Sequence, residues 1–292
     1  VIADIAPHDS VERYTKLGVE VIKGYGKLID PWTVEIALST GGTQTLSART
    51  IVIATGARPF VPPLPGLEEA GYVTSDTLWS KFAQLDEPPK KLVVLGGGPI
   101  GSELAQSFAR LGSQVTQVEM AERIVIKEDL EVSEFATQAL KSSGVNVLTN
   151  HQALRCEVRN NKKYLVVQHQ EKEFDIEYDE LLCAVGRSAR LTGYGLEELG
   201  IETNRTIQTN DYLETLYPNI FAAGDIAAAK ADDAHMALMS CQHAMPMGAH
   251  AGYNAVHSLL GLPHQKYAQP DYSTCVDLGE IGALLTKGWD RQ

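Results

Sequence analysis

Residues Lys91–Glu119 read KLVVLGGGPIGSELAQSFARLGSQVTQVE. The apolar run Leu92–Leu95 is typical of a parallel strand that is buried on both faces. A glycine motif with the spacing GxGxxG follows it: Gly96, Gly98, Pro99, Ile100 and Gly101. In this motif the first glycine permits a tight turn, the second lets a pyrophosphate approach the backbone, and the third lets the next helix pack closely. Apolar residues then recur at helical spacing up to Gly112, which predicts that helix.

A second predicted strand, Gln114–Val118, ends at an acidic residue, Glu119. An acid about 20 residues beyond such glycines accepts hydrogen bonds from the 2′-OH of an adenosine ribose. The order of strand, glycines, helix, strand and acid therefore predicts a dinucleotide-binding unit rather than an ordinary glycine-rich turn. A carboxylate at this point repels a 2′-phosphate, so NAD(H) is favoured over NADP(H), while the nearby Arg123 leaves NADP(H) as the less favoured alternative.

The composition narrows the class of protein. A chain of 292 residues with 44% apolar content is long enough for two globular domains. The 37 acidic and 25 basic residues give a net charge of −12 without a basic cluster, which argues against nucleic acid or an anionic membrane as a partner. No apolar run approaches the ~18 residues of a membrane span, and no signal-peptide pattern opens the sequence. We therefore expect a cytoplasmic protein without a transmembrane segment.

The segment before the proline-rich stretch 59–65 forms a first predicted unit. A helix is predicted over residues 1–17, with Asp9 or Ser10 as its cap and Gly18 as its stop. Short apolar runs separated by turn residues then predict an antiparallel meander and a final strand: 19–22, 33–38, 44–46 and 51–53.

An internal repeat relates this unit to the residues after Lys91. A helix, LGVEVI at 17–22, a meander and IVIATGAR at 51–58 correspond to a helix, SGVNVL at 143–148, a second meander and LLCAVGR at 181–187. The second copy carries a strand, a glycine motif, a helix and an acid that the first copy lacks. We therefore expect a two-nucleotide protein whose first βαβ segment is missing from this chain.

Further elements are predicted downstream. The stretch Asn219–Asp225, NIFAAGD, reads as an apolar strand that ends in an acid able to bind ligand hydroxyls. A long helix is predicted over 232–260, with a kink at Pro246, and the alternating run 271–289 predicts the edge of an antiparallel sheet.

The cysteines and histidines predict neither a disulfide framework nor a metal site. Four cysteines lie far apart without a CxxC pair, which predicts reduced, buried thiols: Cys156, Cys183, Cys241 and Cys275. His235, His243 and His250 do not share one helical face with Cys241, so we predict no metal site.

The chain resembles the two-dinucleotide-binding-domain flavoproteins, the pyridine nucleotide-disulfide oxidoreductase superfamily. Four segments are similar to mercuric reductases and dihydrolipoamide dehydrogenases: APHDSVERYTKLGVEVI at 6–22, IVIATGARPFVPPLPGLEE at 51–69, YVTSDTLW at 72–79 and the glycine-motif stretch at 92–119. Segments 235–256 and 275–292 look more like FAD-containing type II NADH dehydrogenases, through HMALMSCQHAMPMGAHAGYNAV and CVDLGEIGALLTKGWDRQ.

The resemblance implies roles for individual residues. The glycine motif and Glu119 match the family's NAD motif, and Glu103 matches a catalytic-site acid near the nicotinamide and the flavin. Glu103 also has a simpler interpretation as a first-turn acid stabilised by the helix dipole. Thr55 and Gly56 match a motif that crosses between the two nucleotide sites, and Gly186 with Arg187 match its second copy.

The resemblance also implies the flavin site and the architecture. Gly224 and Asp225 match the motif whose Asp binds the flavin ribityl chain, although Asp225 could instead cap a following helix. The implied fold is α/β, with a Rossmann-like NAD-binding domain inserted in a partial FAD-binding domain. Its three layers are arranged as ββα and include antiparallel meanders. The expected domains are a partial FAD-binding domain (1–75), an NAD-binding domain (76–205), the return of the FAD-binding domain (206–262) and the start of a C-terminal interface domain (263–292).

Three functions follow as hypotheses. The first is a homodimeric, FAD-dependent NAD(P)H oxidoreductase that moves hydride from NADH to flavin and on to a second acceptor, such as a quinone, a disulfide or another small molecule. The second is a chain that binds NAD(H) without turnover, because the flavin ADP half lacks its glycine motif. The third is that residues 210–292 mainly build a dimer surface.

Overall fold

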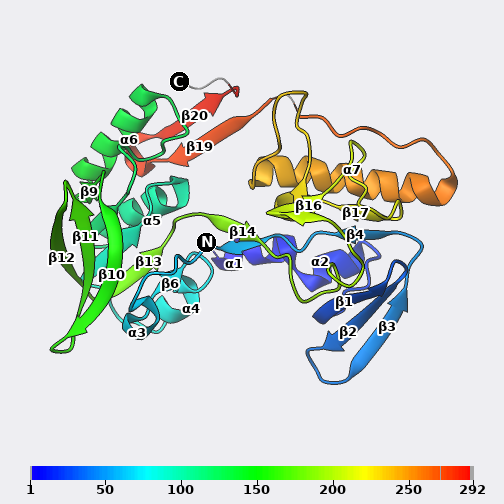
Figure 1. Ribbon diagram of the computed structural model, residues 1–292, viewed down its shortest axis with the longest axis horizontal. Coiled ribbons are helices and arrows are strands. Elements are labelled where there is room, and N and C mark those ends of the chain that lie inside the picture. Colours follow the sequence, from blue (N-terminus) through cyan, green and yellow to red (C-terminus); the bar gives the residue numbers. More distant parts are fainter. Residues whose placement is uncertain (1, 270, 290–292) are drawn as a thin grey trace. The chain divides into compact units, whose positions relative to one another are not determined.

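The chain folds into two compact units, and the computed structural model describes residues 2–269 and 271–289 (Figure 1). Unit 1 comprises residues 1–54, 191–230 and 244–267, and unit 2 comprises residues 55–190, 231–243 and 268–292. The long segment 55–190 of unit 2 is therefore inserted between two segments of unit 1.

Unit 2 is built on a five-stranded parallel sheet. Its strand order is β6-β13-β7-β8-β9. The strands are β6 (Val73–Thr74), β7 (Lys91–Leu95), β8 (Gln114–Val118), β9 (Asn146–Leu148) and β13 (Glu180–Cys183). Helix α5 (Pro99–Arg110) connects β7 to β8, and α6 (Leu130–Ser142) connects β8 to β9. This is the βαβ arrangement that the apolar run and the glycines predict.

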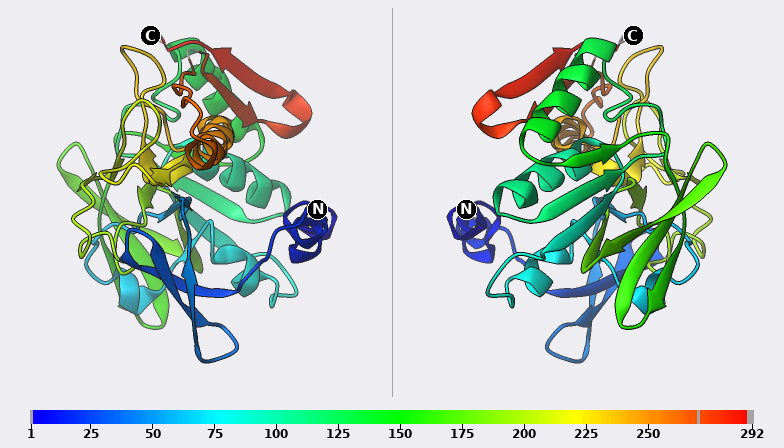
Figure 2. Two further views of the ribbon diagram at one scale, coloured as in Figure 1. Left: turned by 90° about the vertical axis from the view of Figure 1, so that its right-hand side faces the viewer. Right: turned by 90° about the vertical axis from the view of Figure 1, so that its left-hand side faces the viewer.

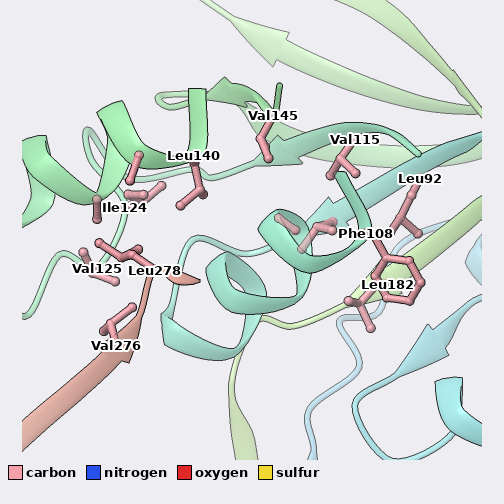
Figure 3. Packing of buried hydrophobic residues seen from close by; sticks show 14 of the residues in the cluster. Leu92, Phe108, Val115, Ile124, Val125, Leu140, Val145, Leu182, Val276 and Leu278 are labelled. Carbon is pink, nitrogen blue, oxygen red and sulfur yellow. The ribbon is translucent and has the colours of Figure 1, made fainter. Parts of the chain in front are cut away.

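Successive residues of β7 are buried on opposite faces of this sheet. Leu92 and Val94 belong to a core cluster with Phe108 of α5 and Leu140 of α6 (Figure 3). Val93 and Leu95 belong to a second cluster that includes residues of α3 (Leu67–Ala70) and of an antiparallel meander. The meander consists of β10 (Gln152–Arg159), β11 (Lys162–His169) and β12 (Lys172–Tyr178). Meander, parallel sheet and helices form three layers, so the predicted ββα architecture is confirmed.

A hairpin near the C-terminal end completes the helical face of unit 2. Strands β19 (Ser273–Asp277) and β20 (Ala283–Lys287) are antiparallel and lie beside α6 in Figures 1 and 2. Val276 and Leu278 are each 1% exposed and join the core cluster of the helical face (Figure 3). The run 271–289 is therefore antiparallel as predicted, and it contributes core residues.

Unit 1 contains a smaller set of strands and one long helix. Its N-terminal meander is β1 (Gly24–Asp30), β2 (Thr33–Leu38) and β3 (Thr43–Ser47). Strand β4 (Ile51–Ile53) pairs in parallel with β17 (Ile220–Ala222), whose Phe221 is fully buried. The remaining elements include β15 (Thr203–Asn204), β16 (Thr206–Gln208), β18 (Ala227–Ala228) and the helix α7 (Cys241–Leu260), whose first three residues belong to unit 2.

The internal repeat is visible in the helix ends. Helix α2 (Val11–Lys16) ends at Gly18 with φ +85°, and α6 ends at Gly144 with φ +90°. At both ends the next N–H bonds back over five residues, from Val19 to the Tyr14 carbonyl and from Val145 to the Leu140 carbonyl. The two copies therefore share the same Schellman-type stop.

The structure corrects the prediction of one helix over residues 1–17. Residues 2–16 instead contain three short pieces: α1 (Ile2–Ile5), the 3₁₀ helix η1 (Ala6–Asp9) and α2. Ser10 is extended between the last two pieces and accepts a hydrogen bond from the Arg13 N–H, so it is the cap of α2 alone. The predicted strand 19–22 is also wrong. Its counterpart β9 is paired with β8, whereas among the described residues no strand pairs with 19–22.

The prediction of a helix from residue 232 is also wrong, because α7 begins only at Cys241. The Asp232 carboxylate accepts hydrogen bonds from the N–H groups of Ala234 and His235, at 2.8 and 2.7 Å. Such a local turn competes with helix formation. Among the cysteines, Cys156 and Cys183 are buried as predicted, whereas Cys241 and Cys275 are exposed.

Candidate nucleotide-binding site

The candidate site lies where the strand order of the unit 2 sheet reverses. The chain runs from β7 to β8 and β9 on one side, and then returns to β13 on the other side of β7. The carboxyl ends of β7 and β13 are linked by a hydrogen bond from the Ala184 N–H to the Leu95 carbonyl, at 2.8 Å. Ligands of open α/β sheets bind at such a switch point, outside the carboxyl ends of the strands.

The three motif glycines differ in what surrounds them. A Cβ on Gly96 would lie 2.4 Å from the Ala184 carbonyl oxygen, and Gly96 has φ +114°. A Cβ on Gly101 would lie 2.4 Å from the Gly96 carbonyl oxygen, so α5 approaches the end of β7 closely. A Cβ on Gly98 would meet no protein atom within 4 Å. Gly96 and Gly101 are thus required by the protein's own packing, and Gly98 keeps open the space that a pyrophosphate would fill.

The start of α5 is suited to an anion. Gly98 is the N-cap and supplies no side chain to the helix, and Pro99 occupies the first turn. The first N–H groups of a helix lack intrahelical acceptors, and the helix dipole adds positive potential there. The chain therefore offers backbone donors at Ile100 and Gly101 to a phosphate group.

Glu119 follows β8, and its side chain contacts the glycine loop that follows β7. Its Oε2 accepts a hydrogen bond from the Gly97 N–H at 2.6 Å, and its Oε1 accepts one from the Ala121 N–H at 2.7 Å. A Cβ on Gly97 would lie 2.9 Å from the Glu119 side chain. The sequence interpretation passed over Gly97. The sequence feature that indicates its role is the unbroken run GGG, in which the middle glycine leaves room for the Glu119 side chain.

Arg123, in the loop after Glu119, binds backbone carbonyl oxygens of the same loop. The Arg123 guanidinium donates hydrogen bonds to the carbonyl oxygens of Glu128 and Ile126, at 2.6 and 2.9 Å. The Val125 N–H bonds to the Gly97 carbonyl at 2.7 Å, and Val125 has φ +42°, which is rare for a β-branched residue. These contacts hold the loop against the glycine motif and engage the Arg123 guanidinium with backbone carbonyls.

The two copies of the crossing motif lie side by side. Strand β5 (Ala57–Pro59) pairs antiparallel with β14 (Arg187–Ala189). Gly56 and Gly186 precede these strands with φ of +65° and +127°. The Arg187 guanidinium donates to the Ala57 carbonyl at 2.9 Å and lies 3.6 Å from the Asp76 carboxylate. Thr55 lies in the segment that connects β4 to this ribbon.

Glu103 lies in the second turn of α5, so the interpretation as a first-turn acid is wrong. Its Oε1 accepts a hydrogen bond from the Asp277 N–H at 3.1 Å. The helix that carries the glycine motif is thereby tied to the C-terminal hairpin. Nearby, the Arg110 guanidinium donates to the Leu278 carbonyl at 3.1 Å and occupies the space beside Gly279.

In unit 1, Gly224 and Asp225 follow the carboxyl end of β17. They form the 3₁₀ helix η2 (Gly224–Ile226), and Gly224 has φ +78°. The Ala223 N–H bonds to the Ile53 carbonyl at 3.0 Å, so the ends of β17 and β4 coincide. A cap on a following helix is not the role of Asp225, because α7 starts only at Cys241.

Other candidate sites are weaker. Within the described ranges, no three His, Cys, Asp or Glu side chains come together as metal ligands. No helix in those ranges is long and apolar enough to cross a bilayer. An open surface depression of about 620 Å³ lies at β6 and is lined by nine residues between positions 68 and 84, none of which belongs to the glycine motif. The convergent polar groups at the switch point make it the stronger candidate.

The sheet, the helices and the glycine loop give unit 2 a Rossmann-type α/β fold. The model of the family described as pyridine nucleotide-disulphide oxidoreductase matches residues 5–248. The chain belongs to this family, whose members are oxidoreductases that use FAD and NAD(P)H.

Several relatives and solved structures are similar. The mercuric reductase of Bacillus cereus is 38% identical over 221 residues, which cover 74% of this chain and 34% of that protein. The mitochondrial dihydrolipoyl dehydrogenase of Dictyostelium discoideum is 32% identical over 258 residues, which cover 85% of this chain and 52% of that protein. The HOCl-induced flavoprotein disulfide reductase RclA of Escherichia coli, solved as the Cu(II) complex of a cysteine-to-serine mutant, has a TM-score of 0.76 and 25% identity over 91% of this chain and 57% of its own. The chain thus spans between about a third and a half of the curated relatives described here.

Proposed function

We propose that this chain is the nucleotide-handling part of an FAD-dependent NAD(P)H oxidoreductase, which moves hydride from NADH to flavin and on to a second acceptor. One observation carries the proposal. The open Gly98 position stands at the start of α5, beside the switch point, with the Glu119 carboxylate in the same loop system. This arrangement fits a pyrophosphate with an adenosine ribose attached.

In this proposal the glycine motif and Glu119 bind NADH. The N–H groups at the start of α5 receive the pyrophosphate, and Glu119 receives the ribose hydroxyls through lone pairs left over from its two backbone bonds. The negative charge of Glu119 and the engagement of Arg123 with backbone carbonyls support NAD(H) over NADP(H).

The remaining motif residues are assigned to the flavin and to the chain segments that cross between the two nucleotide sites. Asp225 offers a carboxylate at a strand end of unit 1, and Gly56 and Gly186 give turns without side chains in unit 2. FAD, when bound, supplies the redox chemistry, so the protein's task is to orient the two rings and exclude water. We assign residues 1–75 and 206–262 to the FAD-binding domain, 76–205 to the NAD-binding domain and 263–292 to the interface domain.

Glu103 is proposed as the acid nearest the reacting rings. Its carboxylate keeps one oxygen, Oε2, for a partner other than the Asp277 N–H. The second acceptor is a small molecule, a quinone or a disulfide, and the segments that resemble type II NADH dehydrogenases keep the quinone among them. A cytoplasmic homodimer completes the proposal.

The alternative is a chain that binds NAD(H) without turnover. The two functions are separated by the visible absorbance spectrum of the purified chain, recorded after addition of FAD, before and after NADH. A flavin band that bleaches with NADH supports the oxidoreductase. NADH binding without a flavin band supports the alternative, and the absence of NADH binding in a fluorescence titration contradicts both.

A further inference from the structure

Gln117 is a fully buried polar residue among the apolar side chains of the helical face of unit 2. It belongs to β8, two residues before Glu119, and its side chain is 0% exposed. Side chains alternate between the two faces of a strand, so Gln117 shares a face with Val115, a member of the core cluster of the helical face. The nucleotide motif assigns no role to this glutamine.

The Gln117 side-chain amide binds the first motif glycine. Its Nε2 donates hydrogen bonds to the Gly96 carbonyl oxygen at 3.1 Å and to Ser102 Oγ at 3.2 Å. The other amide atom, Oε1, is buried and has no hydrogen-bond partner among the described residues. A buried acceptor without a partner lowers stability, so an apolar side chain would suit the core better. The amide therefore serves the glycine loop rather than the core.

The protein also holds the next carbonyl of the glycine loop. The Gly97 carbonyl oxygen accepts a hydrogen bond from the Val125 N–H at 2.7 Å and a longer one from Ser102 Oγ at 3.5 Å. In a trans peptide the carbonyl and the following N–H point in opposite directions. The N–H groups that follow the Gly96 and Gly97 carbonyls therefore point away from these donors. One of them belongs to Gly98, where an added Cβ would meet no protein atom within 4 Å, so a donor and open space occur at the same residue.

We infer that Gln117 positions the glycine loop for the pyrophosphate of the bound dinucleotide. The inference rests on the proposed function, because it takes the phosphates to lie at Gly98 and the start of α5. Glycine peptides rotate readily, and rotation of the peptide between Gly96 and Gly97 would turn a carbonyl oxygen, which repels phosphate, toward the ligand. The Gln117 amide holds that carbonyl on the buried side. Gln117 acts through the backbone of the loop and is a positioning residue.

The test compares two buried glutamines of the same unit. In Gln117→Met an unbranched side chain of similar length replaces the amide and offers no hydrogen-bond donor. The matched control is Gln106→Met. Gln106 lies on α5, is 3% exposed and donates to Ser143 Oγ at 3.0 Å, at the end of α6 rather than at the glycine loop. Fluorescence titration measures NADH binding, calorimetry measures binding of ADP-ribose, and denaturant unfolding measures the stability of each variant.

We expect Gln117→Met to bind NADH and ADP-ribose about tenfold more weakly than the wild type. Its denaturant midpoint should stay close to the wild type, because one unpaired buried acceptor, Oε1, is exchanged for another, the Gly96 carbonyl. The control should bind both probes normally. Unchanged binding by Gln117→Met would overturn the inference alone, and so would an equal loss of binding in Gln106→Met. A loss of binding that only follows a large loss of stability would also overturn it, since the glutamine would then merely support the fold.

A second variant tests whether a donor at this position restores binding. Gln117→Glu keeps the shape of the side chain, and the introduced carboxyl group donates to the Gly96 carbonyl only while it is protonated. Burial and the nearby Glu119 carboxylate raise the pKa of that carboxyl. At acidic pH we therefore expect NADH binding close to that of the wild type at the same pH, and weaker binding as the pH rises through the raised pKa. Binding at acidic pH as weak as that of Gln117→Met would overturn the inference. A wild-type chain that binds no NADH would overturn the proposed function as well.

Discussion

The Glu119 carboxylate and the Gly97 N–H are joined by a hydrogen bond of 2.6 Å. The acid at the end of β8 therefore holds the glycine loop at the end of β7. This link explains why a glycine is needed between Gly96 and Gly98: a side chain at residue 97 would collide with the acid. The shape of the glycine loop consequently depends on the Glu119 side chain.

Replacing this acid should change cofactor selectivity. In Glu119→Ala we expect NADH to bind about tenfold more weakly, because a hydrogen bond to a charged group contributes ~1.5–3 kcal/mol. NADPH should be less affected, because its 2′-phosphate no longer meets a carboxylate. Fluorescence titration with both nucleotides measures the ratio. Glu122→Ala, an exposed acid in the same loop, is the charge-matched control, and an unchanged NADH/NADPH ratio in Glu119→Ala would show that the acid does not reach the ribose.

Two glycine substitutions should separate binding from folding. Gly98→Ala adds a Cβ that meets no protein atom, so we expect unfolding free energy within ~0.5 kcal/mol of the wild type but NADH binding at least about tenfold weaker. Gly101→Ala places its Cβ 2.4 Å from the Gly96 carbonyl and should lose ~1–3 kcal/mol of stability. Denaturant unfolding and NADH titration of each variant test this pair. Normal NADH binding by Gly98→Ala would remove the pyrophosphate from this position.

Much of the parallel sheet could be predicted from the sequence, because its signals are local. The run Leu92–Leu95, the glycine motif and Gly112 mark the strand, the turn and the helix end within the one segment 92–112. The prediction of a helix from residue 232 is wrong for an equally local reason, since the Asp232 side chain binds the backbone N–H groups of the next residues. Hydrophobic periodicity carries no information about that competition.

Contacts between segments that lie far apart along the chain could not be predicted from the sequence. The stacking of the His151 ring on the His169 ring, with centroids 4.4 Å apart, depends on the register of β10 against β11, and the bond from Asp277 to Glu103 depends on where the hairpin packs. Spacing within one segment does not determine either contact. The internal repeat could be predicted more fully, because the similar local sequences around Gly18 and Gly144 give the same kind of helix stop.

The C-terminal hairpin should contribute to the stability of unit 2. Leu278 is 1% exposed in the helical-face core, whereas Leu285 on the same hairpin is 62% exposed. We expect Leu278→Ala to lose ~2–5 kcal/mol of unfolding free energy. The matched control Leu285→Ala should change it by less than ~0.5 kcal/mol. Denaturant titrations of the two variants measure the difference, and equal stabilities would mean that the hairpin is not packed on the core.

The four cysteines should divide into two reactive and two protected thiols. Burial raises the pKa of the Cys156 thiol, and it raises that of Cys183 to about 12, so the reactive thiolate is absent from these two residues in the folded chain up to mildly alkaline pH. Cys241 and Cys275 are exposed. Iodoacetamide at mildly alkaline pH, followed by intact mass measurement, should add two labels to the folded chain and four to the unfolded chain. A Cys241→Ser/Cys275→Ser double variant should take none while folded, and rapid labelling of that variant would show that the core around Cys183 is open to solvent.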